Sequence, residues 1–323
     1  MTKFDVFGIG NALMDVLIQV DNSHLEELDL EKGVFHLFDS EKIEKILERL
    51  KDKEHKLIPA GGTTNTIMGI ANLGGRCVLC GKIGRDRHGD AYEEIIVKEN
   101  IKSNLSRCDI DATGRNINLI TPDAERTFAV NLGAAINKNK EDVFDQDIKN
   151  SKIFYFTGYE FESMKEVVLH ALDVAKENGV KIAFDLADPK LVERNFEEIG
   201  LLLKSVDIVF MNEAEAEALT GLIADEAAAK IGEDVDIVVV KVCDKGSFVF
   251  SQGETFKIEP FLKKAVDTTG AGDLYAAGFL YGYVRGKPLD LCGKYGSYMA
   301  SKIVEVIGAK LENSIKDEID KLE

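Results

Sequence analysis

A glycine-rich stretch that ends in an aspartate offers the clearest chemistry in this sequence. It runs Asp267-Thr-Thr-Gly-Ala-Gly-Asp273 and leads into an apolar segment that predicts a helix beginning near Leu274. Gly270 and Gly272 let a ligand approach the main chain, and the N–H groups at the start of a helix attract anions. Asp273 would repel a phosphate but can take a proton from a hydroxyl that attacks phosphorus. A simple helix cap needs only one such residue, so we interpret the stretch as a phosphate site with a general base.

Asp15 stands at the end of a second glycine-containing stretch, Gly8-Ile-Gly10-Asn11-Ala-Leu-Met-Asp15. The third glycine of a dinucleotide fingerprint is missing, and the chain returns to a strand-like pattern, which argues against a Rossmann-type site. The two carboxylate oxygens of Asp15 can accept hydrogen bonds from a pair of adjacent hydroxyls. We therefore interpret Asp15 as a ligand for a diol, with a surface turn as the alternative.

Two further motifs open predicted helices. Gly61-Gly62-Thr-Thr-Asn65 would let a sugar ring lie against the main chain, and the amide of Asn65 offers a donor and an acceptor for hydroxyls. A turn followed by an N-capped helix would give the same spacing. Asn212-Glu-Ala-Glu215 has the form of an N-cap followed by a glutamate, close to a capping box. A single carboxylate also suits Mg²⁺, which keeps several of its waters when bound.

The stretch that ends at Asp273 resembles the C-terminal signature of the PfkB (ribokinase-like) family of carbohydrate and nucleoside kinases, and the Gly61 motif resembles its N-terminal signature. The resemblance implies that Asp273 is the catalytic base. It also implies that Asp267 helps to hold a monovalent cation such as K⁺, and that Glu215 acts on Mg²⁺ through water. The anion hole for the transferred phosphoryl group would be the backbone of Thr269, Gly270, Ala271 and Gly272.

Two segments resemble adenosine kinases within that family, the one from Gly8 to Asp15 and the one from Arg126 to Ala135. Arg126 would then reach the transferred phosphate, and the alternative is a solvated charge in a polar turn. Glu160 stands where adenosine kinases tend to carry an aromatic residue, which opposes a simple adenine stack. The resemblance implies that the acceptor substrate contacts Asn11, Asp15, Gly61, Gly62, Asn65, Tyr159 and Phe128.

The expected nucleotide contacts depart from the usual family pattern. Many members carry Thr-x-Gly-x-x-Gly after a strand, whereas this chain has Lys241-Val-Cys-Asp-Lys-Gly246 and keeps only the last glycine. The residues expected to contact ATP are Asn212, Thr269, Lys241 and Gly246. A nucleoside site also requires a flat apolar slot beyond Asp15, for which the candidates are Phe35, Phe128, Tyr159 and Phe161.

Strand-like and helix-like segments alternate regularly from residue 150 onward, which predicts an α/β fold with a central, mostly parallel sheet covered by helices on both faces. Residues 14–37 and 113–133 break that alternation with strands that lack intervening helices. We expect one kinase domain over residues 1–323. Its large α/β core would comprise residues 1–13, 38–112 and 134–323, and the two strand-rich segments would form a small β-sheet lid.

Composition excludes several classes of protein. The 323 residues include 57 acidic and 40 basic side chains, for a net charge of −17, which works against binding to nucleic acid or to an anionic membrane surface. The sequence has no signal peptide pattern and no apolar run long enough for a membrane span, so we expect a cytoplasmic protein, monomeric or homodimeric. Five cysteines fit reduced thiols. Cys77 and Cys80 are three apart in a predicted strand and should point to opposite faces as buried structural residues.

These observations predict an ATP-dependent kinase that uses Mg²⁺ to phosphorylate a primary hydroxyl of a ribose-containing small molecule, and the resemblance implies K⁺ as a further cofactor. The expected substrate is adenosine, phosphorylated at the 5′-hydroxyl to AMP. A sugar kinase of the same family, acting on fructose, ribose or 2-keto-3-deoxygluconate, is the first alternative. A ligand sensor without catalytic activity is a remote one, because a sensor does not need the base Asp273.

Overall fold

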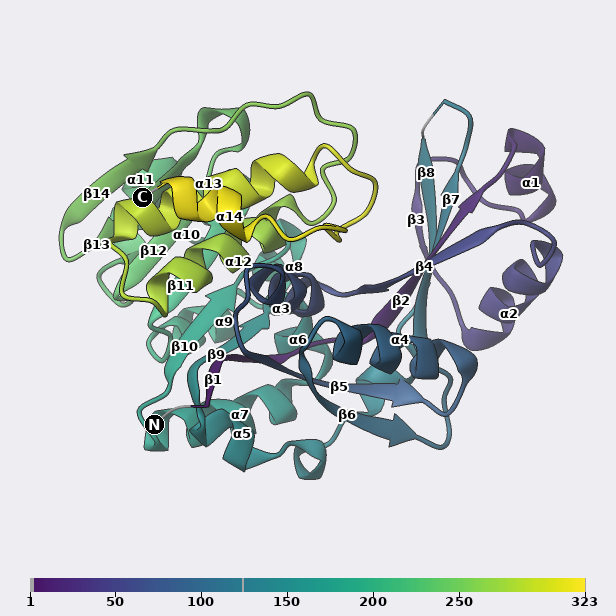
Figure 1. Cartoon of the computed structure of the whole chain (residues 1–323), viewed down its shortest axis with the longest axis horizontal. Helices are drawn as coiled ribbons and strands as arrows, with labels where there is room; N and C mark the ends of the chain where they lie inside the picture. The colour runs from purple at the N-terminus through teal and green to yellow at the C-terminus, as the bar shows by residue number, and fades with distance from the viewer. Residues whose placement is uncertain (1–2, 124, 323) are drawn as a thin grey trace.

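The core of the molecule is a nine-stranded sheet with strand order β14-β13-β12-β11-β10-β9-β1-β5-β6. The computed structural model describes residues 3–123 and 125–322. Neighbouring strands from β6 to β12 are parallel, and only β13 and β14 at one edge are antiparallel (Figure 1). The strands are β1 (Phe4–Ile9), β5 (Cys77–Gly84), β6 (Lys102–Cys108), β9 (Ser151–Thr157), β10 (Lys181–Asp185), β11 (Ile208–Asn212), β12 (Ile237–Lys241), β13 (Ser247–Ser251) and β14 (Glu254–Ile258).

Helices cover both faces of this sheet, as the alternating pattern predicts. Two separate clusters of buried apolar side chains hold the layers together. One cluster joins the sheet to α3 (Gly62–Asn72), α4 (Arg87–Lys98), α12 (Ala271–Tyr283), α13 (Leu289–Ile303) and α14 (Lys316–Ile319). The other joins it to α5 (Asp145–Lys149), α6 (Gly158–Ser163), α7 (Lys165–Glu177), α8 (Pro189–Arg194), α9 (Phe196–Leu203), α10 (Glu213–Thr220) and α11 (Ala224–Ile231). Short 3₁₀ helices lie at Gly133–Asn137, Lys140–Asp142, Cys243–Lys245 and Asp320–Leu322.

The cysteine pair of β5 divides between these two clusters. Cys77 packs in the first and Cys80 in the second, and both are almost fully buried. Their placement on opposite faces confirms the expectation that they are structural residues. No group of three or more metal-binding side chains occurs within the described ranges. No helix of the same residues is long and apolar enough to cross a membrane.

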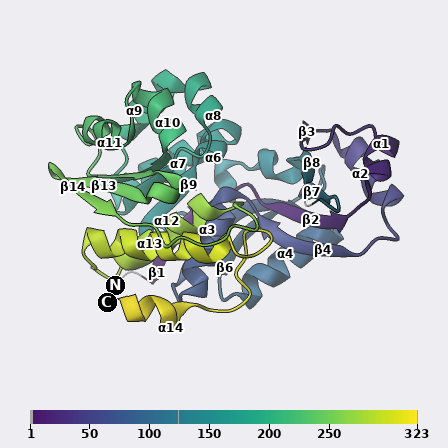
Figure 2. The ribbon, with the colours of Figure 1, turned by 90° about the horizontal axis from the view of Figure 1, so that it is seen from above.

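A second, five-stranded sheet has the order β3-β8-β7-β2-β4 and lies to one side of the helix-covered core (Figures 1 and 2). Its strands are β2 (Leu13–Gln19), β3 (Phe35–Leu37), β4 (His55–Ala60), β7 (Gly114–Ile120) and β8 (Arg126–Asn131). The segments expected to form a small sheet do supply β2, β3, β7 and β8. The expectation that residues 38–112 belong wholly to the core needs a correction, because β4 pairs along β2. That the small sheet moves as a lid stays a prediction.

The register of the small sheet decides which side chains share a face, because successive residues of a strand alternate between faces. Asp15 lies opposite Asn116, and Phe128 lies between Asn118 and Phe35 across neighbouring strands. We call this side the Asp15 face; it comprises Asp15, Phe35, Leu37, Asn116, Asn118, Arg126 and Phe128. The opposite face is apolar, with buried residues such as Val16 and Ile117, and packs against α1 (Asn22–Glu27) and α2 (Ser40–Arg49).

Candidate active site

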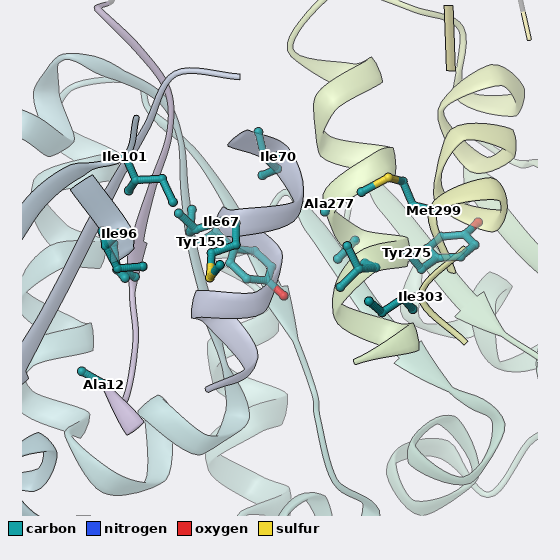
Figure 3. Packing of buried hydrophobic residues seen from close by; sticks show 14 of the residues in the cluster. Ala12, Ile67, Ile70, Ile96, Ile101, Tyr155, Tyr275, Ala277, Met299 and Ile303 are labelled. Carbon is teal, nitrogen blue, oxygen red and sulfur yellow. The ribbon is translucent and has the colours of Figure 1, made fainter. Parts of the chain in front are cut away.

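Two glycine-rich helix starts meet because α3 and α12 pack in very close contact. A Cβ atom on Gly69 of α3 would lie 2.6 Å from the Cβ of Ala277 on α12, so glycine is required at the crossing. Figure 3 shows Ala277 of α12 between α3 and the side chain of Met299 of α13, whereas Ile67 of α3 lies on the opposite side of that helix, near Tyr155. The crossing brings the first turns of α3 and α12 together.

Asp273 lies at this meeting point, in the first turn of α12. Its Oδ2 accepts a hydrogen bond of 2.8 Å from Nδ2 of Asn65, and its backbone carbonyl accepts one of 3.1 Å from Thr66 Oγ1. A Cβ atom on Gly62 would lie 3.5 Å from Oδ1 of Asp273. The two motifs singled out in the sequence, separated by about 200 residues of chain, therefore form one site.

The electrostatic surroundings of Asp273 suit a general base. Loss of solvation raises the pKa of its carboxyl group to about 7, the hydrogen bond from Asn65 opposes the shift, and the nearby charge of Asp185 adds to it. A base whose pKa lies near neutrality combines a substantial ionised fraction with a real affinity for the proton.

The turn before Asp273 has a backbone shape that suits an anion. Gly270 has a φ of +77° and caps α12, and a Cβ atom there would lie 2.5 Å from the Cβ of Ala309. Glycine is thus required at this position. The N–H groups that follow belong to the first turn of a helix of 13 residues, where they have no carbonyl partner within the helix. The turn can therefore hold a phosphoryl oxygen next to Asp273.

Lys241 approaches the same helix start from the end of β12. Its Nζ would lie 3.1 Å from a Cβ atom on Gly272, and it donates a 2.8 Å hydrogen bond to Oδ2 of Asp185. Burial disfavours the ammonium, but the carboxylates of Asp185 and Glu215 outweigh burial and raise the pKa of Lys241. A fixed ammonium beside the positive end of a helix is favourable only with an anion close by. Lys241 and the turn thus provide positive potential for a phosphate.

Asp15 is only 8% exposed and lies on the face of the small sheet named after it. Oδ1 accepts a 2.9 Å hydrogen bond from Nδ2 of Asn116, whereas the buried Oδ1 of Asn116 has no hydrogen-bond partner among the described residues. Burial raises the pKa of Asp15 to about 7, against the effects of Asn116 and the charge of Arg126. On the same face, Phe128 lies on β8, the neighbour of β7. Phe35 lies beyond it on β3 and is 62% exposed. A polar group that can bind a diol thus lies next to an apolar surface.

Arg126 joins the small sheet to the phosphate turn. Its Nη2 lies 2.8 Å from Oδ2 of Asp267, and its Nη1 donates to Oγ1 of Thr269 at 3.4 Å. Asp267 also accepts hydrogen bonds from the backbone of Thr269 and Gly308. The structure places the guanidinium of Arg126 in an ion pair beside the phosphate turn, and its contact with a transferred phosphate stays a prediction.

Comparison with known proteins matches this arrangement of elements and motifs. The family model for pfkB family carbohydrate kinases covers residues 38–316. The chain belongs to the PfkB family of carbohydrate kinases. It is therefore a phosphotransferase whose acceptor is a hydroxyl group, with the ribokinase-like α/β fold that the sequence predicts.

Relatives in this family carry the names of both sugar and nucleoside kinases. An adenosine kinase structure from Sinorhizobium meliloti is 33% identical, with a TM-score of 0.88 over 99% of this chain and 100% of that one. A probable sugar kinase structure from Rhizobium etli CFN 42 is 31% identical, with a TM-score of 0.88 over 99% of both chains. A 5-dehydro-2-deoxygluconokinase from Listeria monocytogenes is 28% identical over 99% of this chain and 96% of its own length. The chain is thus similar over almost its whole length both to proteins named as sugar kinases and to one named as an adenosine kinase.

PfkB kinases use ATP with a divalent metal ion, and the carboxylates near Lys241 fit such an ion only indirectly. Both oxygens of Glu215 accept hydrogen bonds from Asn212, which caps α10 as the sequence predicts. Burial and the charge of Asp185 raise the pKa of Glu215. The site holds one ammonium group, that of Lys241, and three carboxyl groups, those of Glu215, Asp185 and Asp273. It therefore favours an added cation. Mg²⁺ held by ATP phosphates and waters would suit this arrangement.

Asn11 and Glu160 are linked to each other inside the protein, and a substrate contact of Asn11 stays a prediction. The carboxylate of Glu160 is fully buried and accepts hydrogen bonds from the backbone and side chain of Asn11, and from Thr63 and Thr157. The Oδ1 atom of Asn11 accepts from Ser163. Asn11 therefore joins these segments of the chain. Glu160 points into the protein and caps α6, so it does not oppose an adenine ring.

Other expected contacts divide into accessible and inaccessible side chains. Tyr159 is 45% exposed and remains a candidate, whereas Phe161 is 2% exposed and packs edge-on against Phe184. Phe161 therefore cannot line the apolar slot. Gly246 has a φ of +93°, and a Cβ atom there would lie 2.0 Å from the carbonyl oxygen of Ile258. Glycine at this position is explained by the turn between β12 and β13, without a nucleotide.

Two residues at the site were missed in the sequence, Asp185 and Asn116. Asp185 is the last residue of β10, at the carboxyl edge where ligands bind in open α/β sheets. Its position at the end of a predicted strand was a usable signal. Asn116 lies within a strand, and only the pairing of β2 with β7 places it beside Asp15.

Proposed function

We propose that this protein is an adenosine kinase that transfers the γ-phosphoryl group of ATP to the 5′-hydroxyl of adenosine, giving AMP and ADP. The observation that carries the proposal is the apolar part of the Asp15 face. Phe35 and Leu37 are 62% and 66% exposed, and both lie on the side of the sheet that carries Asp15 and Phe128. Large exposed apolar groups gathered on one surface are typical of a binding site. A purine ring would cover them, whereas a small free sugar would leave them in water.

In this proposal the small sheet binds the acceptor, and the core supplies the groups that act on the phosphate. Asp15 accepts hydrogen bonds from the ribose 2′- and 3′-hydroxyls, and Gly61, Gly62 and Asn65 lie along the sugar. Asp273 takes the proton from the 5′-hydroxyl as its oxygen attacks the γ-phosphorus and the bond to the β–γ bridging oxygen breaks. The turn at Thr269–Gly272 and the ammonium of Lys241 stabilise the charge on the phosphoryl oxygens. Magnesium, when bound with ATP, neutralises part of the phosphate charge.

A sugar kinase is the second candidate, and a specific observation favours it. Asn116 lies opposite Asp15 with Asn118 beside it on the same face, and the buried Oδ1 of Asn116 has no hydrogen-bond partner in the part of the chain that the structure describes. A buried acceptor without a donor is costly, and a further sugar hydroxyl would supply that donor. The relatives named 5-dehydro-2-deoxygluconokinase, which match over almost the whole chain, agree with this alternative.

Product identification separates the two candidates. The enzyme is incubated with ATP and Mg²⁺ together with adenosine, fructose, ribose, 2-keto-3-deoxygluconate or 5-dehydro-2-deoxygluconate, and the phosphorylated product is assigned by phosphorus NMR. We expect AMP from adenosine, with a higher kcat/KM than for any free sugar. A thermal-shift measurement gives an independent readout, because a ligand that binds only the folded protein raises its stability. Efficient turnover of a sugar without turnover of adenosine would reject the proposal in favour of the sugar kinase.

A further inference from the structure

Asp267 connects three segments of the chain through one carboxylate. Oδ1 accepts hydrogen bonds from the backbone N–H of Thr269 at 3.1 Å and from its Oγ1 at 2.7 Å. Oδ2 accepts one of 2.7 Å from the backbone of Gly308 and lies 2.8 Å from the guanidinium of Arg126. The shape of the turn from Asp267 to Gly270 therefore depends on this carboxylate.

Arg126 is the only one of these partners that belongs to the small sheet. It begins β8, and β7 lies between β8 and β2, the strand that carries Asp15. The side chains of Arg126 and Asp267 are only 15% and 9% exposed. Removing Arg126 from such a pair takes away the neighbouring positive charge and leaves the carboxylate of Asp267 only its hydrogen bonds from Thr269 and Gly308. The ion pair is thus a strong link between the sheet that would hold the acceptor and the turn that would hold the phosphate.

We infer that Arg126 is a positioning residue that orders the phosphate turn through Asp267 when the small sheet lies against the core. Binding of an acceptor on the Asp15 face favours that position of the sheet, and the ion pair passes the effect to Thr269 and the start of α12. The acceptor and ATP therefore bind with positive cooperativity. The inference holds for any acceptor on this face and does not depend on adenosine.

The same contacts bear on the expected K⁺ site. Arg126 already supplies a positive charge to Asp267, and all four hydrogen bonds and ion-pair contacts of the carboxylate are made within the protein. The Arg126→Ala variant should respond to added guanidinium, because that cation replaces the lost group.

A double-mutant cycle distinguishes action through Asp267 from direct contact with phosphate. We measure kcat/KM for ATP, at a saturating concentration of the best acceptor, in Arg126→Ala, Asp267→Asn and the double variant. Each single change should lower kcat/KM by about tenfold or more, a typical size for coupling between sites, and the double variant should be no worse than the more severe single one. Additive losses would overturn the inference, because they would show that Arg126 acts without Asp267.

Two further measurements protect this test against misfolding. Calorimetry should show that acceptor strengthens binding of a non-hydrolysable ATP analogue to wild type but not to Arg126→Ala. Low concentrations of guanidinium should restore Arg126→Ala and leave Asp267→Asn unchanged. The matched control is Lys32→Ala, which removes an exposed ion pair with Asp123 on the same small sheet and should retain full coupling. Wild-type coupling in Arg126→Ala would overturn the inference even if the Asp267 variants did not fold.

If adenosine is not turned over, the proposed function fails. The double-mutant cycle is then measured with the sugar that is turned over. Failure of the inference and failure of the proposed substrate are therefore separate outcomes.

Discussion

Asn65 and Asp273 meet at the crossing of α3 and α12, with Nδ2 of Asn65 2.8 Å from Oδ2 of Asp273. The hydrogen bond stabilises the ionised form of the aspartate, while loss of solvation raises its pKa to about 7. The relationship sets the fraction of enzyme whose base is ready to accept a proton at neutral pH.

The pH dependence of activity should follow Asp273. The base must be deprotonated, so kcat/KM should rise with pH and level off above about 7. Asn65→Ala removes the bond that favours the carboxylate and should move the midpoint of the profile to higher pH. Asn72→Ala, at the other end of α3, serves as the control and should leave the midpoint unchanged. A midpoint that stays in place in Asn65→Ala would count against Asp273 as the titrating group.

The contribution of Asp273 to folding stability should fall over the pH range in which activity rises. Because the pKa of Asp273 is raised from 3.8 to about 7 on folding, the folded protein binds more protons than the unfolded one between these values. The contribution of this group to stability therefore declines as pH rises from about 4 to 7. Asp273→Asn removes the titration, so its Tm should exceed that of wild type above pH 7 and approach it near pH 4. Equal Tm values throughout would show that the carboxyl group is not desolvated.

Lys241 should matter both for nucleotide binding and for the base. Lys241→Met keeps the apolar stem and removes the charge, which leaves the carboxylates of Asp185, Glu215 and Asp273 uncompensated. We expect a higher KM for ATP and a shift of the activity profile to higher pH, because the pKa of Asp273 rises further. Lys245→Met, in the exposed turn after β12, is the matched control. An unchanged KM and profile in Lys241→Met would remove Lys241 from the site.

The apolar part of the Asp15 face should distinguish nucleosides from sugars. Phe128→Ala should lower kcat/KM for adenosine by roughly 10- to 200-fold, the range found for lost apolar contacts in substrate pockets, and should affect a free sugar far less. Asp15→Ala should impair every acceptor with a vicinal diol. Leu201→Ala removes an apolar side chain on α9, far along the chain from the small sheet and 69% exposed, and should have no effect. Equal losses for adenosine and sugars in Phe128→Ala would indicate a purely structural role.

The predictable part of this structure is the part encoded locally. The alternation of segments gave the parallel sheet, and Gly61–Asn65 and the stretch from Asp267 to Asp273 predicted two helix starts that the structure brings together. Register and pairing across the sheet were not visible in the sequence, so β4 was assigned to the core and Asn116 was missed. Polar contacts between residues distant in sequence, such as those of Asn11 with Glu160 and of Arg126 with Asp267, are not predictable because no local pattern encodes them.

The turnover of Asp273→Asn tests the central claim most directly. Asparagine keeps the size of the side chain and removes its capacity to accept a proton, so kcat should fall by about 100-fold or more while the Kd of the acceptor stays close to that of wild type. Asp290→Asn, in the first turn of the neighbouring helix α13, controls for the loss of an acidic residue at a helix start. A near-normal kcat in Asp273→Asn, with the acceptor still bound, would contradict the account.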